Sequence, residues 1–251
     1  MRLTPILLSL VTVSLAAPAN YFDDAYDFSD ELSDYYSKVS QYINRVKKST
    51  SPSASCDTSK ISLPSFASGL PAPNGTKPMY VALGRGTQNY TCADSTSAST
   101  PFAIGAVANL YNATCLAANY PDLLESLPNI AYKISLPTTE YATFPPANLE
   151  LIGHHFFTST IPEFNLDTTE AKQFGVALTK KESSLNAPST AVKGEYGAVA
   201  WLYLSTIEGT VGNYKGVYRV NTASGSPPDT CEKMPSSFEI QYSAVYYFYG
   251  S

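Results

Sequence analysis

The segment from Phe238 to Tyr249, FEIQYSAVYYFY, constrains the fold of this chain more than any other stretch. Its apolar residues occupy every second position at the start and are separated there by Glu239, Gln241 and Ser243. A period of two predicts a β-strand, because successive side chains of a strand point to opposite faces. The apolar face of this predicted strand consists of Phe238, Ile240, Tyr242, Ala244, Tyr246 and Phe248.

The rest of the chain after Cys56 shows little helical periodicity and many short β-type runs between Pro-, Gly- and Ser-rich turns. Only YPDLLESLPN predicts a short helix there. Because the runs follow one another without helical crossovers, we expect an all-β domain, an antiparallel sandwich or barrel of about eight strands. The other strands are predicted at Met79–Leu83, Thr87–Cys92, Phe102–Asn112, Leu151–Thr158, Gly175–Lys181, Val199–Thr206 and Tyr214–Asn221.

The N-terminus, MRLTPILLSLVTVSLAAPAN, has the pattern of a secretory signal peptide. Arg2 precedes an apolar run from Ile6 to Ala16, and small residues follow. The run is shorter than the roughly 20 residues that a spanning helix needs, so we expect no membrane span. Residues 1–19 are therefore predicted to be removed, leaving a secreted protein in the extracellular space or at the cell wall.

Residues 20–55 differ from the rest and predict an amphipathic helix at 28–46, followed by the linker STSPSAS. Acidic residues crowd its start and basic residues its end, as the helix dipole favours. The helix would lie outside a single β-domain of residues 56–251. Three roles remain open: packing on that domain, contact with a partner, or a pro-segment cut after Lys48. Its apolar face is Phe28, Leu32, Tyr35, Val39, Tyr42 and Val46.

The composition argues against nucleic acid as a partner. The chain has a formal net charge of −5, and after the signal segment its only arginines are Arg45, Arg85 and Arg219. Nucleic-acid binding needs a basic patch, and none is visible. The 19 tyrosines and the low share of charged residues, 15%, are typical of secreted β-proteins.

Four cysteines and three glycosylation sequons fit an exported protein, so we expect disulfides and glycans at Asn74, Asn89 and Asn112. Two sequons end directly against a cysteine. In a strand, a residue three positions after an outward Asn faces inward, which predicts two inward cysteines. We therefore expect one disulfide between Cys92 and Cys115, and the other between Cys56 and Cys231.

The stretch LGRGTQNYTC, Leu83 to Cys92, resembles a glycine loop but lacks the third glycine and the following helix of a dinucleotide fingerprint. We expect no cofactor and interpret the stretch as a bend entering a strand, with Gly84 and Gly86 allowing a bulge or a close approach. Asn89 outward then places Gln88 and Tyr90 inward. The ligand-binding candidates of this stretch are Arg85, Gln88 and Tyr90.

The only two histidines, His154 and His155, are weak catalytic candidates. As neighbours in a strand they point to opposite faces, so the pair does not predict a metal site. Each is more simply explained as a buried or a surface histidine, while one acting as general acid or base is the alternative.

Further ligand-binding candidates are Arg219, Asn221 and Trp201. In a strand, Arg219 and Asn221 would share a face with Val217. Arg219 would pair with a carboxylate that holds a loop, or would bind an anionic ligand. Trp201 alternates with apolar neighbours, which favours packing in the core over a platform for a sugar.

Several motifs together resemble a family of secreted fungal and bacterial proteins of unknown function, whose fungal members are often labelled malate dehydrogenase. The similar motifs are YVALGRGTQNYTC, GAVANLY, GHHFF, GAVAWLYL, VYRVNTASGSPPDTC and IQYSAVYYFY. The resemblance runs from about Cys56 to Tyr249 and leaves out Asn20–Ser55, while Tyr120–Asn148 looks like a variable insertion. It implies no catalytic residues for this chain.

These observations favour a secreted, glycosylated, disulfide-stabilised β-domain that binds a glycan or a small molecule. One alternative is a polysaccharide hydrolase or lyase that uses a histidine with a carboxylate or a tyrosine. Malate dehydrogenase, the family label, is disfavoured because the dinucleotide fingerprint is missing. The residues do not decide between a binding protein and an enzyme.

Overall fold

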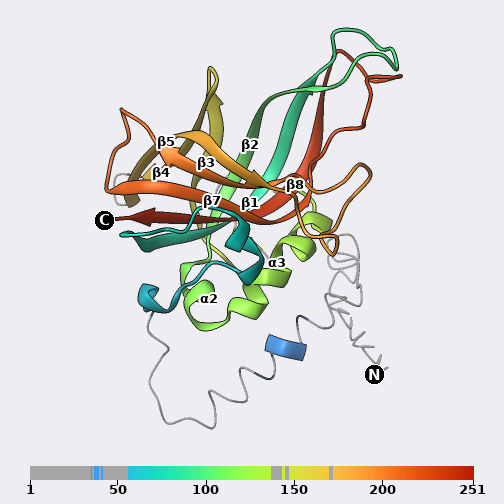
Figure 1. The fold of residues 1–251 in the computed structure, drawn as a ribbon. Coiled ribbons are helices and arrows are strands. Elements are labelled where there is room, and N and C mark those ends of the chain that lie inside the picture. Colours follow the sequence, from blue (N-terminus) through green and yellow to red (C-terminus); the bar gives the residue numbers. More distant parts are fainter. Residues whose placement is uncertain are drawn as a thin grey trace, which may run out of the picture.

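The computed structural model describes residues 56–136, 143–144, 147–169 and 172–251, with residues 35, 37–39 and 41 of the N-terminal region. These residues form a closed barrel of antiparallel strands that follow the chain order, with β1 pairing β8 (Figure 1). The predicted all-β class is confirmed, and of its two forms the barrel is correct. The strands are β1 Lys77–Thr91, β2 Phe102–Asn112, β3 Leu151–Thr158, β4 Ile161–Thr169, β5 Lys172–Leu185, β6 Trp201–Thr206, β7 Tyr214–Ser224 and β8 Ser237–Gly250.

The sequence prediction was correct at β2 and β3 and wrong at two places. The two strands predicted across Met79–Cys92 are one strand, β1, whose pairing runs through Gly84 and Gly86 without a shift. Strand β4 was missed because its sequence, IPEFNLDTT, contains proline, acidic residues and asparagine, which are rare in strands. Its inward residues Phe164 and Leu166 nevertheless alternate as a strand requires.

Strand β8 is buried on both faces from Tyr242 onward, whereas the alternation predicted one buried face. The cause lies in two separate cores. One fills the barrel interior, and the other lies between the outer side of the barrel and the helices. The inner core takes Tyr242, Ala244, Tyr246 and Phe248 from this strand, and the outer core takes Val245, Tyr247 and Tyr249.

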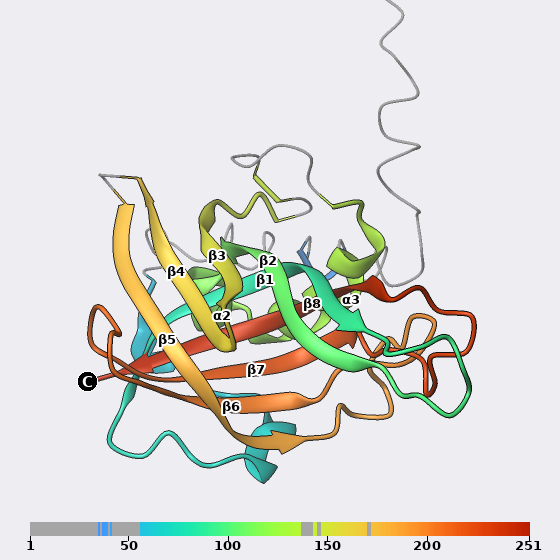
Figure 2. The same ribbon diagram turned by 90° about the horizontal axis from the view of Figure 1, so that it is seen from above.

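Helices cover the outer face of β1, β7 and β8 (Figures 1 and 2). Two short 3-10 helices, Thr58–Lys60 and Ser65–Gly69, precede the barrel, and α2 Thr114–Asn119 and α3 Pro121–Lys133 follow β2. Helix α3 extends the single helix predicted here, and α2 was not predicted. Helix α3 begins at a proline, which suits the first turn, and carries a basic residue in its last turn. Its buried face is Leu123, Leu124, Leu127, Pro128, Ile130 and Ala131.

The described residues of the N-terminal region are helical and contact the outer core. Tyr35 is 3% exposed within this core, and Val39 packs against it. Both belong to the apolar face predicted for the helix at 28–46. The signal segment 1–19 and the remainder of 20–55 lie outside the described residues.

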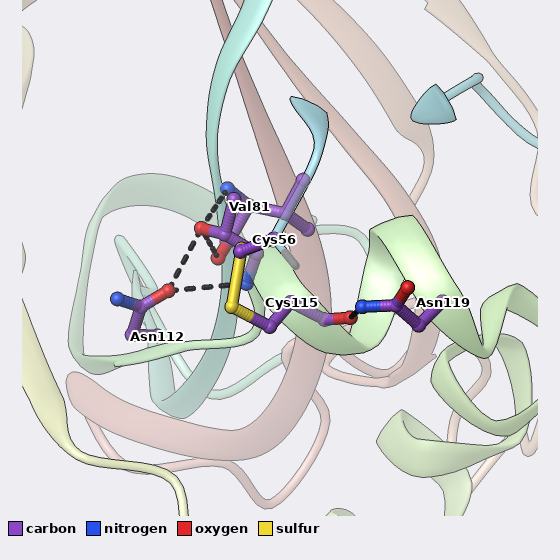
Figure 3. Close-up of a disulfide and its surroundings, with 6 residues drawn as sticks. Cys56, Val81, Asn112, Cys115 and Asn119 are labelled. Atoms are coloured by element: carbon purple, nitrogen blue, oxygen red, sulfur yellow. Dashed lines mark hydrogen bonds between the residues drawn. A yellow bond between two sulfur atoms is a disulfide. The ribbon is translucent and has the colours of Figure 1, made fainter. Parts of the chain in front are cut away.

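The predicted disulfide pairing is wrong: Cys56 bonds Cys115, and Cys92 bonds Cys231. Strand β2 ends at Asn112, so Cys115 lies on α2 and the strand alternation does not extend to it (Figure 3). Moreover, Ala82 pairs Asn112 whereas Thr91 pairs Phe102. Cys92 and Cys115 therefore lie at opposite ends of the β1–β2 pair, roughly 30 Å apart at about 3.3 Å per strand residue.

Candidate functional site

The barrel interior contains a cavity of about 510 Å³ that opens near the β3–β4 turn. Thr160, Lys180 and Lys181 at this opening are exposed, whereas at the inner end Gln88, His155 and Tyr246 are buried and Arg219 is partly buried. The wall between is mostly apolar. It is formed by Ala103, Gly105, Ala106, Phe157, Ile161, Pro162, Phe164, Leu202, Leu204 and Ile207.

Arg219 of β7 and Gln88 of β1 lie together at the inner end of this cavity. Arg219 donates through Nε and Nη2 to the carbonyl oxygen of Ala200, at 3.2 and 2.9 Å. Its Nη1 donates to Gln88 Oε1 over a long 3.4 Å. Gln88 is 8% exposed, and its Nε2 is buried without a hydrogen-bond partner among the described residues. The Gln88 amide also faces the Tyr242 hydroxyl and Arg219 faces the Tyr246 hydroxyl, because each lowers the pKa of that tyrosine.

His155 of β3 lines the same cavity and is 4% exposed. Its ring stacks on Phe164 with 4.1 Å between centroids, and burial lowers the pKa of His155 to about 4. The ring is therefore neutral near pH 7. Nδ1 lies 2.8 Å from the carbonyl oxygen of Glu163, which only accepts, so Nδ1 carries the proton and Nε2 the lone pair.

Two tyrosines of β8 complete the polar cluster. The hydroxyls of Tyr242 and Tyr246 lie 2.8 Å apart and share a hydrogen bond. Burial raises the pKa of both, and the nearby Arg219 opposes this shift. The Tyr246 ring is 5.8 Å from the His155 ring, between centroids. Both hydroxyls consequently stay protonated, and the cluster presents a cation and neutral polar groups.

Arg85, although only three residues before Gln88, lies on the other side of the barrel wall. It is 1% exposed and sits beneath the end of α3, where it donates to the carbonyl oxygens of Ala131, Tyr132 and Ile134. It also donates to Gln241 Oε1 at 2.6 Å, and burial lowers the pKa of Arg85 to about 10. Its place and bonds assign it a structural role.

Tyr90 lies beyond the cavity, at the end of the barrel. It is 5% exposed, its hydroxyl donates to the carbonyl oxygen of Gly225 at 2.7 Å, and its ring stacks on Phe238. Burial raises the pKa of Tyr90 to about 12. The prediction that Gln88 and Tyr90 share the inner side of β1 agrees with these positions, but only Gln88 lines the cavity.

Trp201 and Asn221 line a second, smaller hollow of about 260 Å³ on the outer side of the barrel. Asn221 was predicted to share a face with Arg219, and this is wrong. It has a positive φ of 49°, and the pairing of β7 with β8 shifts between Val220 and Ala223. Such a bulge reverses the alternation of side chains. Trp201 is 3% exposed, packs edge-on against Phe66, and belongs to the outer core.

His154 and His155 do lie on opposite faces of β3, and only His155 lines the cavity. Within the part of the chain that the structure describes, no three His, Cys, Asp or Glu side chains are grouped to hold a metal ion. The backbone carbonyl of Glu163 contacts His155, but the Glu163 carboxylate does not. The carboxylate accepts a hydrogen bond from the Thr158 hydroxyl at 2.7 Å, at an exposed position. Thus a tyrosine, and not a carboxylate, accompanies the histidine.

The glycines of LGRGTQNYTC let neighbouring strands and side chains pack closely against β1. A side chain at Gly86 would overlap the backbone of Val107 and Ala108 on the neighbouring strand, and one at Gly84 would meet the Tyr246 ring. This prediction of close approach is confirmed, while the bulge is absent from both positions. Sequence reasoning missed Tyr242 and Tyr246 as site residues, because it assigned them only to an apolar face. Their hydroxyls, in an inward-facing row, were the available signal.

Comparison with known proteins places this barrel in a family. The family model described as Protein of unknown function (DUF3455) matches residues 71–250, which include all eight strands. A second model, Protein of unknown function (DUF2990), matches residues 8–71. No curated protein and no solved structure matches the chain. Since the first match covers well over half of the sequence, the chain belongs to the DUF3455 family of proteins of unknown function.

Proposed function

We propose that this protein binds a small, largely apolar molecule inside its barrel. The observation that carries the proposal is the interior cavity of about 510 Å³, apolar along its wall and polar at its inner end. Ligand sites in proteins typically measure about 300–1,000 Å³ and combine an apolar lining with a few convergent polar groups. Barrels of eight strands are wide enough to hold one small ligand.

The shape of the site favours a small molecule over a glycan. A polysaccharide chain needs a long open groove, whereas this cavity lies inside the barrel and is lined by residues from all eight strands. Stacking on a sugar also needs an accessible aromatic face, and Trp201 is buried in the outer core. The label malate dehydrogenase gains no support, because nicotinamide dinucleotides bind at parallel sheets and the barrel strands all pair antiparallel.

Secretion, glycosylation and a place at the cell wall also belong to this proposal. The two disulfides fit an oxidising compartment, and Asn74 and Asn112 are exposed. Among the described residues, no helix has the length and apolar character to cross a membrane. Mass spectrometry of protein secreted by its native host would test this by the mature N-terminus and the glycan masses.

The test of the binding function uses the neutral fluorescent probe N-phenyl-1-naphthylamine, which becomes bright in apolar surroundings. We expect saturable binding of one probe per chain. Ala106→Phe fills the cavity and should weaken binding at least tenfold, because Ala106 lines it and is 3% exposed. The matched control is Val107→Phe on the outer face of the same strand, where Val107 is 54% exposed.

Circular dichroism confirms that each variant is folded. If Ala106→Phe does not fold, Leu202→Trp replaces it, since Leu202 lines the cavity and is only partly buried. Absence of probe binding to the wild type, or equal loss in the cavity and control variants, would reject the proposal.

An enzyme is the second candidate, favoured by one observation: His155 and Tyr246 meet in the cavity, with ring centroids 5.8 Å apart. The unprotonated Nε2 of a neutral histidine can take a proton from the substrate as general base, while a tyrosine hydroxyl donates its own proton to the leaving group as general acid. Release of reducing ends from laminarin, chitin or pectin, abolished by His155→Phe in a folded variant, would establish this reading. No release from any of the three would count against the polysaccharide enzyme.

A further inference from the structure

The inner end of the cavity carries a cation without an acidic partner. This inference rests on the proposed function and concerns the class of molecule bound. The residues that line the cavity include Arg219, Lys180 and Lys181, and no aspartate or glutamate. Lys180 is exposed and forms an ion pair with Glu182, so the cation that faces the buried end is Arg219. Its described hydrogen bonds go to a carbonyl and an amide oxygen.

A guanidinium in such surroundings is incompletely compensated. It has five N–H groups, of which three are used on Ala200 and Gln88 and one more faces the Tyr246 hydroxyl. At least one N–H therefore remains for another acceptor. Taking a charge out of water is costly unless it is paired, and a carboxylate compensates arginine better than a neutral oxygen does.

Gln88 supplies the second, independent observation. Its side chain is more than nine-tenths buried and lines the cavity, and its Nε2 has no hydrogen-bond partner among the described residues. A buried amide N–H without a partner is costly, because it has lost its hydrogen bonds to water. Because Oε1 of the same amide accepts from Arg219, the unused amide donor and the guanidinium belong to one place. Both side chains line this end of the cavity, where the oxygens of one ligand can accept from them.

The apolar wall of the cavity determines the chemistry of the rest of the ligand. Between this polar end and the exposed opening, the cavity is lined by Phe164, Phe157 and Leu204, with no charged side chain until the lysines. We propose that the ligand is an amphiphilic monocarboxylate whose carboxylate binds Arg219 and the Gln88 amide, with its hydrocarbon body lying along this wall. The neutral His155 adds no second cation, so a single negative charge matches the site.

The experiment compares decanoate with decan-1-ol, which share a hydrocarbon chain and differ in the head group. Displacement of N-phenyl-1-naphthylamine is measured at about pH 8, where the acid is ionised. We expect decanoate to bind at least tenfold more tightly than decan-1-ol. Arg219→Met should abolish this preference by weakening decanoate alone, and Arg219→Lys should restore part of it. Gln88→Met should weaken decanoate severalfold with little change for the alcohol.

The matched control is Lys215→Met, which removes one positive charge from the same strand at an exposed position outside the cavity. It should leave the decanoate preference unchanged. Equal affinity for the two ligands, or a preference that survives Arg219→Met, overturns the carboxylate assignment while probe binding still supports the apolar cavity. If decanoate fails to displace a bound probe, the assignment is likewise wrong. If the probe itself does not bind, both proposals fail.

Discussion

Arg85 and Arg219 are the only arginines among the described residues, and they lie on opposite sides of one barrel wall. Arg85 is under α3 and donates to five backbone carbonyls and one side-chain amide. Arg219 faces the interior and donates to one carbonyl and one side-chain amide. The outer arginine is wholly engaged by the fold, while the inner one makes fewer hydrogen bonds with the described residues.

The difference shows two ways in which the barrel accommodates an arginine, one of them buried and the other partly buried. The last carbonyls of a helix lack partners within the helix and form its negative dipole end, so they suit a guanidinium without any carboxylate. Helix α3 supplies this environment to Arg85, and Ser243 of the outer face also donates to the carbonyl of Pro128 in the same helix. Among the described residues, the hydrogen bonds of Arg219 go to Ala200 and Gln88, which lie outside any helix. A residue type that looked equally functional at both positions is therefore structural at one and a ligand candidate at the other.

The largest expected effect comes from removing the Cys56–Cys115 disulfide, which belongs to the outer layer and not to the barrel interior. This bond closes a sequence separation of 59 residues and ties α2 to the segment before the barrel. Cys56→Ser/Cys115→Ser should lower the free energy of unfolding by about 4 kcal/mol in the loop-entropy model. Probe binding by the remaining folded protein should not change, because neither cysteine lines the cavity. Urea unfolding and probe titration measure the two effects. Weakened binding in folded protein would show that the two regions are coupled.

A comparable but smaller effect is expected from exchanging each arginine for methionine. Arg85→Met leaves several buried carbonyls without donors and should cost about 3 kcal/mol of unfolding free energy. Arg219→Met removes fewer bonds and should cost about 1 kcal/mol while changing ligand preference. Urea unfolding of both variants measures this order. Equal losses, or a larger loss for Arg219→Met, would contradict the assigned roles. Arg85→Lys should not restore stability, because a lysine has three donors in a different geometry.

A further expected effect is a pH dependence of stability that belongs to the interior alone. Burial lowers the pKa of His155 to about 4, below the usual value of 6.5. Between these values the unfolded chain binds a proton that the folded chain excludes. Stability contributed by the neutral ring is thus complete above about pH 6.5 and declines as pH falls toward 4, by about 1 kcal/mol per pH unit.

Urea unfolding at about pH 7.5 and pH 5 compares the wild type with His155→Phe, which keeps a ring against Phe164. The variant should lose less stability on acidification than the wild type does. A His154→Phe control should retain the wild-type dependence of stability on pH, because the proton that burial excludes from the folded chain is the one on His155. Identical slopes for the wild type and His155→Phe would show that His155 does not cause the pH dependence.

Much of the barrel was predictable because local side-chain order decides it. The period of two in β8 and the exact bounds of β2 and β3 follow from apolar residues that alternate between turn residues. Alternation selected Gln88, and scarcity of the residue type selected His155 and Arg219; the barrel brings all three into one cavity although they come from three strands. Alternation failed at Asn221, where a positive φ and a bulge reverse the side chains, and at Cys115, where the strand has already ended.

By itself, the sequence determined the β class, most strand positions and the side of the strand on which most candidate residues lie, since these depend on neighbouring residues. The tertiary structure decided which other segments pack against each face of a strand. It closed the sheet into a barrel, placed α3 over Arg85, set Arg219 at the inner end of a cavity, and formed one disulfide at each end of the β1–β2 pair. These outcomes depend on contacts between segments far apart in the chain, which no local pattern specifies.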